Sequence, residues 1–199
     1  LEKLRYYDDY VKSGAYTKCD IFTHFDEKFT ELEGKTWGII GLGSIGRRVA
    51  DIAKAFGLHV IYVSASGRPP QEGYEQVDLD TLLRTSDIVS VHAPLNEYTE
   101  NLMNAEAFAK MKHNAIFLNL GRGPIVVEED LAQALEQGEI QAAGLDVLCV
   151  EPMREDNPLR RITDSRKLLI TPHIAWASTE ARTRLMKIIE GQIEKFLRK

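Results

Sequence analysis

Three polar residues each follow a short apolar run in the second half of the chain. Arg122 lies in NLGRGPI, Glu151 in DVLCVEP and His173 in LLITPHI. Parallel strands end at the same edge of a sheet, where open sheets bind ligands, so we expect these side chains to lie near one another. An imidazole, with an ordinary pKa of about 6.5, exchanges a proton at neutral pH, and a carboxylate on its other nitrogen would stabilise the imidazolium. A planar guanidinium suits a carboxylate, so the set predicts proton transfer on an anionic substrate.

Two of these residues also have a structural interpretation. Arg122 could cap the loop that follows it, and a single histidine after a proline is more often structural than catalytic. Gly121 and Gly123 leave room beside the arginine for a substrate. The occurrence of all three residue types at neighbouring strand ends favours the chemical interpretation.

A glycine turn in the first half of the chain indicates a nucleotide site. The sequence GLGSIG at 41–46 follows the apolar run WGII and precedes an amphipathic helix. Gly41 permits the tight turn, Gly43 lets a phosphate approach the backbone, and Gly46 allows close packing of helix on strand. The N–H groups at the helix N-terminus then face an anion. In this context the motif predicts a dinucleotide site.

The residue expected to contact the ribose leaves the coenzyme undecided between NAD and NADP. An NAD site usually has an acidic residue at the end of the second strand, about 20 residues after the turn. Here that strand ends at Ser64, and the first acid is Glu72. Arg68 is close enough in sequence to meet a 2′-phosphate, although it could equally be a solvated loop residue.

The elements that must position these residues alternate along the chain. Apolar runs separated by amphipathic segments predict an α/β fold, a Rossmann-type doubly wound parallel sheet at 34–199, after an arm at 1–33 that begins as a helix. Strands are expected at 37–41, 59–64, 88–93, 115–120, 142–148 and 168–171, and helices at 44–56, 79–84, 104–112, 128–136 and 178–198. The apolar period of the first of these helices predicts that it buries Ile45, Val49, Ile52, Ala53 and Phe56.

Composition excludes several classes of function. The 199 residues carry a net charge of −5 and no basic block, which argues against a nucleic-acid partner. No apolar stretch approaches the ~18 residues that span a bilayer, so no membrane partner is expected. Cys19 and Cys149 have no CxxC spacing, so we expect no metal site and a reduced, cytoplasmic setting. The start at Leu1 within a predicted helix suggests an excised piece of a longer protein.

Five segments, in order, resemble the D-isomer-specific 2-hydroxyacid dehydrogenases, a family that uses NAD or NADP. They are GIIGLGSIG, SDIVSVHAPLNEYTENLMN, NLGRGPIVVEEDL, AGLDVLCVEP and TPHIAWAS, and the likeness covers residues 32–199. The resemblance implies that Arg122 binds and polarises the substrate, that His173 is the acid/base and that Glu151 is its partner. It further implies contacts to pyrophosphate by Ser44 and Ile45, to the nicotinamide by Asp146 and to the substrate side by Trp176.

The family resemblance also carries expectations about the whole molecule. Family members have a second, substrate-binding domain to which nothing here corresponds, so we expect coenzyme binding with little turnover from this chain alone. A small 2-keto or 2-hydroxy acid substrate and a homodimer are implied. One alternative is a nucleotide-sensing module without catalysis, similar to the corepressor relatives. Formate dehydrogenase is a weaker alternative, because its histidine is paired with glutamine rather than with a residue such as Glu151.

Overall fold

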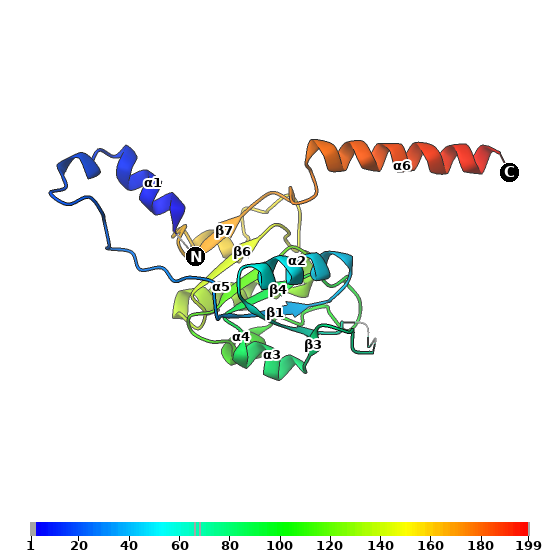
Figure 1. Cartoon of the computed structure of the whole chain (residues 1–199), viewed down its shortest axis with the longest axis horizontal. Helices are drawn as coiled ribbons and strands as arrows, with labels where there is room; N and C mark the ends of the chain where they lie inside the picture. Colours follow the sequence, from blue (N-terminus) through cyan, green and yellow to red (C-terminus); the bar gives the residue numbers. More distant parts are fainter. Residues whose placement is uncertain (1–2, 66, 68, 199) are drawn as a thin grey trace.

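A seven-stranded parallel sheet forms the centre of the computed structural model, which describes residues 3–65, 67 and 69–198 (Figure 1). The order is β3-β2-β1-β4-β5-β6-β7, so the chain starts in the middle and winds outward in both directions. This arrangement confirms the predicted Rossmann-type doubly wound fold. The strands are β1 Thr36–Ile40, β2 His59–Val63, β3 Glu75–Gln76, β4 Ile88–Val91, β5 Ile116–Asn119, β6 Ala142–Leu145 and β7 Leu168–Ile170.

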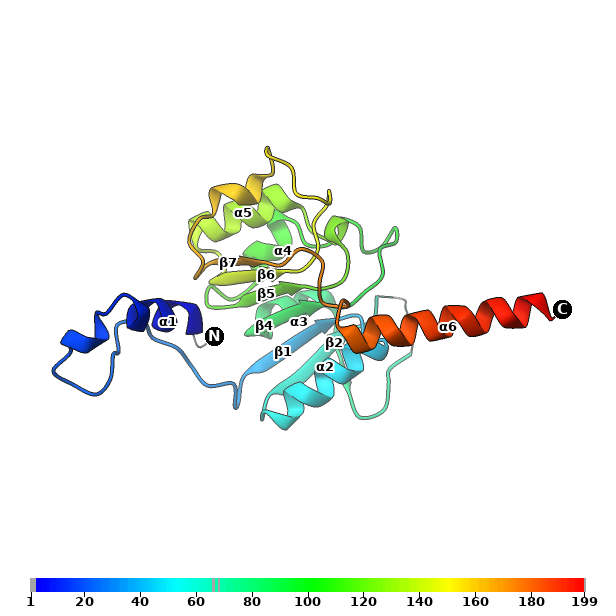
Figure 2. The same ribbon diagram turned by 90° about the horizontal axis from the view of Figure 1, so that it is seen from above.

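Helices cover the two faces of the sheet unequally. Helices α3, α4 and α5 lie on one face, and α2 alone covers β1 and β2 on the other (Figures 1 and 2). Each face has its own cluster of buried apolar side chains. The helices are α1 Leu4–Lys12, α2 Ser44–Ala55, α3 Leu79–Thr85, α4 Ala105–Lys110, α5 Glu128–Gln137 and α6 Thr179–Leu197, with short 3₁₀ helices at Tyr16–Lys18, Gly123–Ile125 and Pro158–Arg161.

The strand register aligns the carboxyl ends of the strands. Ile40 at the end of β1 pairs with Val63 of β2 and with Val91 of β4. Further along the sheet, Val91 pairs with Asn119, Asn119 with Leu145, and Leu145 with Ile170. Because every pair is parallel and in step, the segments that follow β1, β2, β5, β6 and β7 leave the sheet at a single edge.

The expected buried face of α2 is wrong in part. Ala53 is buried and Val49 packs against the core, but Ile45, Ile52 and Phe56 are 58–68% exposed. The face toward the sheet consists of small residues, Gly46, Ala50 and Ala53. The glycine turn sets this orientation, since Gly46 must approach β1 closely, and the larger residues are rotated toward solvent.

Local sequence features explain where α4 begins and where α5 ends. Leu131 and Leu135 of α5 are fully buried, and Gly138 ends that helix in the left-handed conformation (φ 73°). The Asn104 side chain caps α4 by accepting from the N–H of Ala107. Strand β3 was not predicted, because its two residues are polar and exposed and carry no period.

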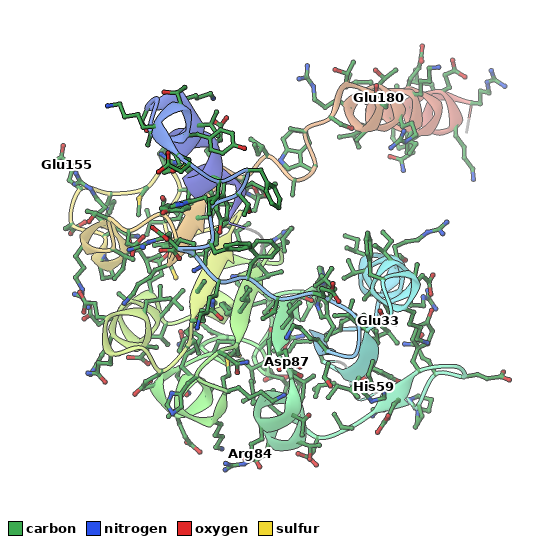
Figure 3. The ribbon with its side chains drawn as sticks, turned by 60° about the vertical axis from the view of Figure 1, so that its left-hand side comes forward. Glu33, His59, Arg84, Asp87, Glu155 and Glu180 are labelled. Atoms are coloured by element: carbon green, nitrogen blue, oxygen red, sulfur yellow. The ribbon has the colours of Figure 1, made fainter. Side chains whose placement is uncertain are left out.

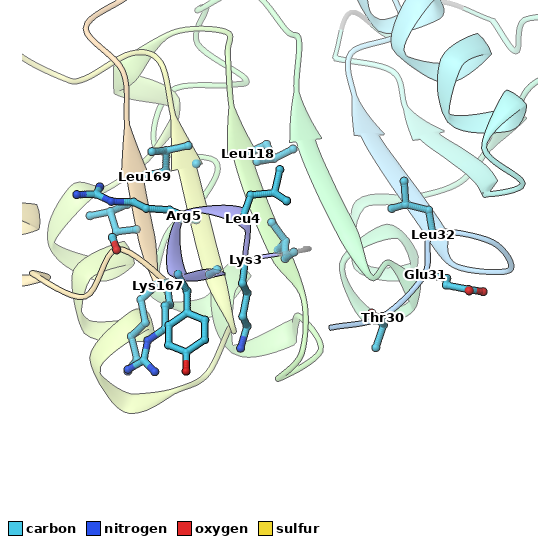
Figure 4. Close-up of a pocket in the computed structure, with 17 residues that line it drawn as sticks. Lys3, Leu4, Arg5, Thr30, Glu31, Leu32, Leu118, Lys167 and Leu169 are labelled. Carbon is cyan, nitrogen blue, oxygen red and sulfur yellow. The ribbon is translucent and has the colours of Figure 1, made fainter. Parts of the chain in front are cut away.

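Two helices, α1 and α6, do not belong to the layers of helices that cover the sheet. Helix α6 projects from the body beginning near Glu180, and none of its described residues is buried (Figure 3). Helix α1 lies near the face of β5 to β7 that α2 leaves uncovered. There a cavity of about 530 Å³ separates Leu4 of α1 from Leu118 and Leu169 (Figure 4). In the described part of the chain, no helix combines the length and apolar character that crossing a membrane requires.

Candidate active site

Neighbouring backbone leaves no room for a side chain at two positions of the glycine turn, whereas a third position is open. Gly41 has a φ of 95°, and a Cβ there would lie 2.8 Å from the backbone of Ala93. A Cβ on Gly46 would lie 2.3 Å from the carbonyl oxygen of Gly41. A Cβ on Gly43 would meet nothing within 4 Å. Gly41 and Gly46 are therefore required by the fold, whereas Gly43 borders free space.

That free space lies at the beginning of α2. Ser44 and Ile45 form its first turn, and both side chains are exposed. The first N–H groups of a helix have no partner within the helix and carry partial positive charge. No acidic residue occupies this first turn to neutralise it. The open space beside Gly43 and the free N–H groups of α2 therefore fit a diphosphate.

The segment expected to contact the ribose follows β2. Ser64 follows that strand and is half-buried, while Arg68 lies outside the described residues. A cavity of about 560 Å³ opens here beside the glycine turn. Its lining consists of Ile40, Val63, Ser64, Ala65, Gly67, Leu79, Asn96, Tyr98, Thr99 and Leu102. Among these residues there is no carboxylate, which keeps both nicotinamide coenzymes compatible with the site.

Hydrogen bonds fix the main chain at Arg122, and the Arg122 side chain is exposed. The buried side chain of Asn119, at the end of β5, donates to the carbonyl oxygen of Arg122 over 3.0 Å and accepts from the N–H of Gly121 over 3.0 Å. The guanidinium donates to the carbonyl oxygen of Gly121 over 2.8 Å. A Cβ on Gly123 would lie 1.9 Å from the carbonyl oxygen of Leu148, so this turn packs directly on the turn after β6.

Glu151 and His173 meet in the structure. Glu151 Oε2 lies 2.7 Å from His173 Nδ1, and Glu151 Oε1 accepts from the N–H of Leu148 over 2.8 Å. These two contacts, that of His173 first, hold the pKa of Glu151 below its usual range. The carboxylate therefore occupies Nδ1, which leaves Nε2 of His173 as the nitrogen available to a substrate. No hydrogen bond joins Arg122 to this pair among the described residues.

Asp146 fixes the segment that carries His173. Its carboxylate is buried and accepts from Thr171 Oγ1 over 2.6 Å and from the N–H groups of Ile174 and Ala175 over 2.9 Å each. Burial acts to raise the pKa of Asp146, but these donors outweigh it and lower the pKa. His173 itself has a φ of 52°, an uncommon conformation for a residue other than glycine. The Asp146 contacts on both sides hold it there.

A second cavity adjoins the acid–base pair. It has a volume of about 540 Å³ and is lined by Asp146, Leu148, Glu151, Pro152, Met153, Ile170, Thr171, Pro172 and His173. Trp176 is 54% exposed three residues beyond His173. This end of the site therefore combines one acid–base pair with largely apolar walls.

Sequence reasoning did not identify Asn119 and His92 as residues of this edge. Asn119 ends an apolar strand, and only its position between two site segments could have revealed its role. His92 follows β4 beneath the glycine turn, and its Nε2 lies 3.0 Å from Ser90 Oγ, which accepts from the Trp37 indole over 2.8 Å. Burial lowers the pKa of His92 to about 4, so it is neutral at physiological pH.

Two other chemistries lack support at this edge. Cys149 lies near Glu151, but loss of hydration and the negative charge of Glu128 raise the pKa of its thiol to about 11. The thiolate, which is the nucleophilic form, is therefore scarce. The described residues contain no group of three or more His, Cys, Asp or Glu side chains arranged to hold a metal ion.

Comparison with known proteins agrees with this geometry. The family model for the D-isomer specific 2-hydroxyacid dehydrogenase, NAD binding domain matches residues 1–175. A hydroxypyruvate reductase of Blautia hydrogenotrophica is 42% identical over 195 residues, which cover 97% of this chain and 60% of that protein. The chain thus spans about 60% of the length of that relative.

Two solved structures share the fold and were determined with coenzyme. D-lactate dehydrogenase of Aquifex aeolicus, complexed with NAD and lactic acid, superimposes with a TM-score of 0.88 at 27% identity, over 100% of this chain and 62% of that one. An acyclic imino acid reductase in complex with NADPH and D-Arg has a TM-score of 0.85 at 34% identity, over 98% of this chain and 60% of that one. Similar structures therefore bind either nicotinamide coenzyme.

Proposed function

This chain belongs to the D-isomer-specific 2-hydroxyacid dehydrogenase family and is its NAD-binding portion, and we propose that it serves an enzyme that interconverts small 2-keto and 2-hydroxy acids. One observation carries the proposal. A carboxylate–imidazole pair, Glu151 and His173, lies at the carboxyl edge of the sheet, at which the glycine turn also lies. A protein that only senses a nucleotide has no need of an acid–base pair.

The coenzyme is NAD or NADP, and this chain would bind it mainly through its backbone. Gly41, Gly43 and Gly46 would shape the turn, and Ser44 and Ile45 would contact the pyrophosphate from the first turn of α2. Support comes from the open space at Gly43 and from the absence of an acidic residue in that turn. Ser64, and Arg68 outside the described residues, would meet the ribose. The bound coenzyme supplies or accepts the hydride.

His173 would donate a proton to the keto oxygen of the substrate during reduction and would remove it during oxidation. Nε2 is the atom that does so, because Nδ1 is occupied by Glu151. The carboxylate of Glu151 would stabilise the imidazolium and fix its orientation. Arg122 would bind the substrate carboxylate and stabilise the negative charge that develops on the oxygen. Its exposed guanidinium between two glycines supports this role.

Asp146 and Trp176 complete the proposed site. Asp146 would lie beside the nicotinamide, and its three hydrogen bonds would keep the His173 segment in position. Trp176, half exposed, would line the substrate side. The relatives named as hydroxypyruvate reductase and glycerate dehydrogenase support a small keto or hydroxy acid as the substrate class.

The proposal extends to organisation. It divides the chain into an arm at 1–33 and a coenzyme-binding domain at 34–199, in keeping with a sheet that begins at Thr36. It includes a homodimer, supported by exposed apolar side chains on α1 and α6. A reducing cytoplasm agrees with two free cysteines, Cys19 and Cys149.

A fluorescence titration with NADH and, separately, NADPH tests the coenzyme assignment on this chain directly. Saturable binding of at least one coenzyme is the expected result, and failure of both would contradict it. Turnover with hydroxypyruvate, glyoxylate or pyruvate is expected to be very low, because the chain spans only about 60% of its relative. An appreciable rate from the purified chain would contradict that second expectation.

A further inference from the structure

One glutamine beside the glycine turn makes contacts that the proposed chemistry does not use. Gln71 lies in the segment that follows β2. Its Nε2 donates to the carbonyl oxygen of Leu42 over 2.9 Å, and its Oε1 accepts from the Arg47 guanidinium over 3.2 Å. Its backbone N–H donates to the Tyr62 hydroxyl over 2.9 Å. A single residue thus connects this segment with the glycine turn, with α2 and with β2.

These bonds connect the glycine turn with the segment that follows β2, part of which lines a cavity. The segment leaves β2 at Ser64, and Ser64, Ala65 and Gly67 line the cavity of about 560 Å³ beside the turn. Pairing with β1 fixes the segment at its β2 end, and Gln71 fixes the other end. Without Gln71, the wall of this cavity would lose its connection to the turn at Leu42.

The guanidinium that Gln71 holds has a neutral side chain as its hydrogen-bond partner. Arg47 is exposed in the first part of α2, and its hydrogen-bond acceptor is a neutral amide. Among the described residues, no carboxylate lies within ion-pair distance of it. A guanidinium binds phosphate through charge-assisted hydrogen bonds, and the cavity lining contributes no carboxylate that would repel a phosphate.

We propose that Gln71 is a positioning residue for the adenosine ribose of the coenzyme, and that the Arg47 guanidinium it holds favours the 2′-phosphate of NADP over the free hydroxyl of NAD. The inference rests on the proposed coenzyme site. It adds two residues that the glycine motif does not include, and it gives the site a preference that Ser64 alone does not determine.

The experiment measures the dissociation constants of NADH and NADPH for the wild-type chain and for matched pairs of variants. R47M is compared with R48M, which removes the same charge from the neighbouring exposed position, where no hydrogen bond reaches the segment. Q71M is compared with Q76M, because Gln76 also bonds the Tyr62 hydroxyl but does not contact the glycine turn. The ratio of the two constants does not depend on the fraction of folded protein.

R47M is expected to lower the preference for NADPH over NADH by about tenfold, which corresponds to the loss of one charge-assisted bond. Q71M is expected to lower it by about threefold and to weaken the binding of both coenzymes. Q71E keeps the size of the side chain but places a carboxylate against Arg47, so it is expected to reduce the preference further. R48M and Q76M are expected to leave the ratio unchanged.

Three outcomes overturn the inference, and the first is distinguishable from the other two. If the wild-type chain binds neither coenzyme, the proposed function fails and this inference fails with it. If the wild-type chain binds, but R47M has the same ratio as R48M or Q71M the same ratio as Q76M, the inference alone is overturned. An equal loss of both coenzymes in Q71M also overturns it, because that result describes a structural contact without selectivity.

Discussion

At the β1–α2 end of the candidate site the groups that face a ligand belong to the backbone, whereas at the β6–β7 end they belong to side chains. At the first end, Gly41 and Gly46 are needed for their lack of a Cβ, and the groups offered to a ligand are N–H groups. At the second end, Glu151, His173 and Asp146 are connected to one another's segments by hydrogen bonds of 2.6–2.9 Å. Binding a phosphate requires fixed dipoles, and moving a proton requires titratable groups, so each end has the composition that its proposed task requires.

The largest expected effect comes from removing the proton donor at the side-chain end. His173→Ala should reduce turnover by about a thousandfold while leaving coenzyme affinity unchanged, because general acid–base catalysis contributes on that scale. The assay uses a chimera in which this chain replaces the matching portion of the Blautia hydrogenotrophica reductase, with hydroxypyruvate as substrate. His113→Ala, at an exposed position, serves as the control. Near-normal turnover of the His173 variant would remove this end from the proposed chemistry.

Glu151→Gln separates charge from shape at the same end. The amide retains an acceptor for the N–H of Leu148 but loses the negative charge that favours the imidazolium. In the same chimera, turnover in reduction should fall by about a hundredfold at neutral pH, less than for His173→Ala. Turnover equal to that of the wild-type chimera would mean that the Glu151 charge is not used.

The backbone end is tested by a variant that the fold itself tolerates. A Cβ on Gly43 meets nothing within 4 Å, so Gly43→Ala should unfold at the same temperature as the wild-type chain. Coenzyme affinity should nevertheless fall by about tenfold or more, because the methyl group occupies space assigned to the pyrophosphate. Gly46→Ala is the contrasting case, since its Cβ would collide with Gly41 and should lower the unfolding temperature. Unchanged affinity of Gly43→Ala would contradict the backbone assignment.

The smallest expected effect concerns pH and stability at the backbone end. Burial lowers the pKa of His92 to about 4, against about 6.5 for an unfolded chain. Between these values the unfolded chain binds a proton that the folded chain does not, so stability is fully present above about pH 6.5 and falls toward pH 4. The free energy of unfolding, measured with urea, should be lower at about pH 4 than at about pH 6.5 by on the order of 2 kcal/mol.

His92→Gln should flatten that dependence, whereas His113→Gln, at an exposed position, should keep it. Carboxylates with lowered pKa values, such as Asp146 and Glu151, contribute stability that begins to be lost below about pH 5, in the wild-type chain and in the variant alike. The difference between the wild-type and His92→Gln slopes therefore isolates the histidine. If the stability of the His92 variant depended on pH as steeply as that of the wild-type chain, the burial of His92 would not be the cause of the dependence.

The same contrast explains how much the sequence could predict. The backbone end is a single contiguous motif, GLGSIG at 41–46, and the strands around it are apolar because both faces of a parallel sheet are covered. The approximate positions of six strands followed from that pattern. The exposure of Ile45, Ile52 and Phe56 could not be predicted in this way. Periodicity identifies a stripe of large apolar residues, but the face of α2 that packs closely on the sheet consists of small residues.

The side-chain end could be predicted only in part. The pairing of Glu151 with His173 followed from their positions after neighbouring strands, and the structure brings them together. The role of Asn119 and the bonds of Gln71 depend on tertiary contacts that no local pattern encodes. Arg68 lies outside the described residues, so its contact with a ribose phosphate stays a prediction.

The central claim is that the two ends form one site, and amide chemical shifts of the ¹⁵N-labelled chain, recorded with and without NADPH, test it most directly. The account predicts that the amides of Gly43, Ser44 and Ile45 shift on binding, together with those of Ile174 and Ala175 beside His173. Shifts confined to the glycine turn would contradict the account, because the acid–base pair would then lie outside the reach of the coenzyme.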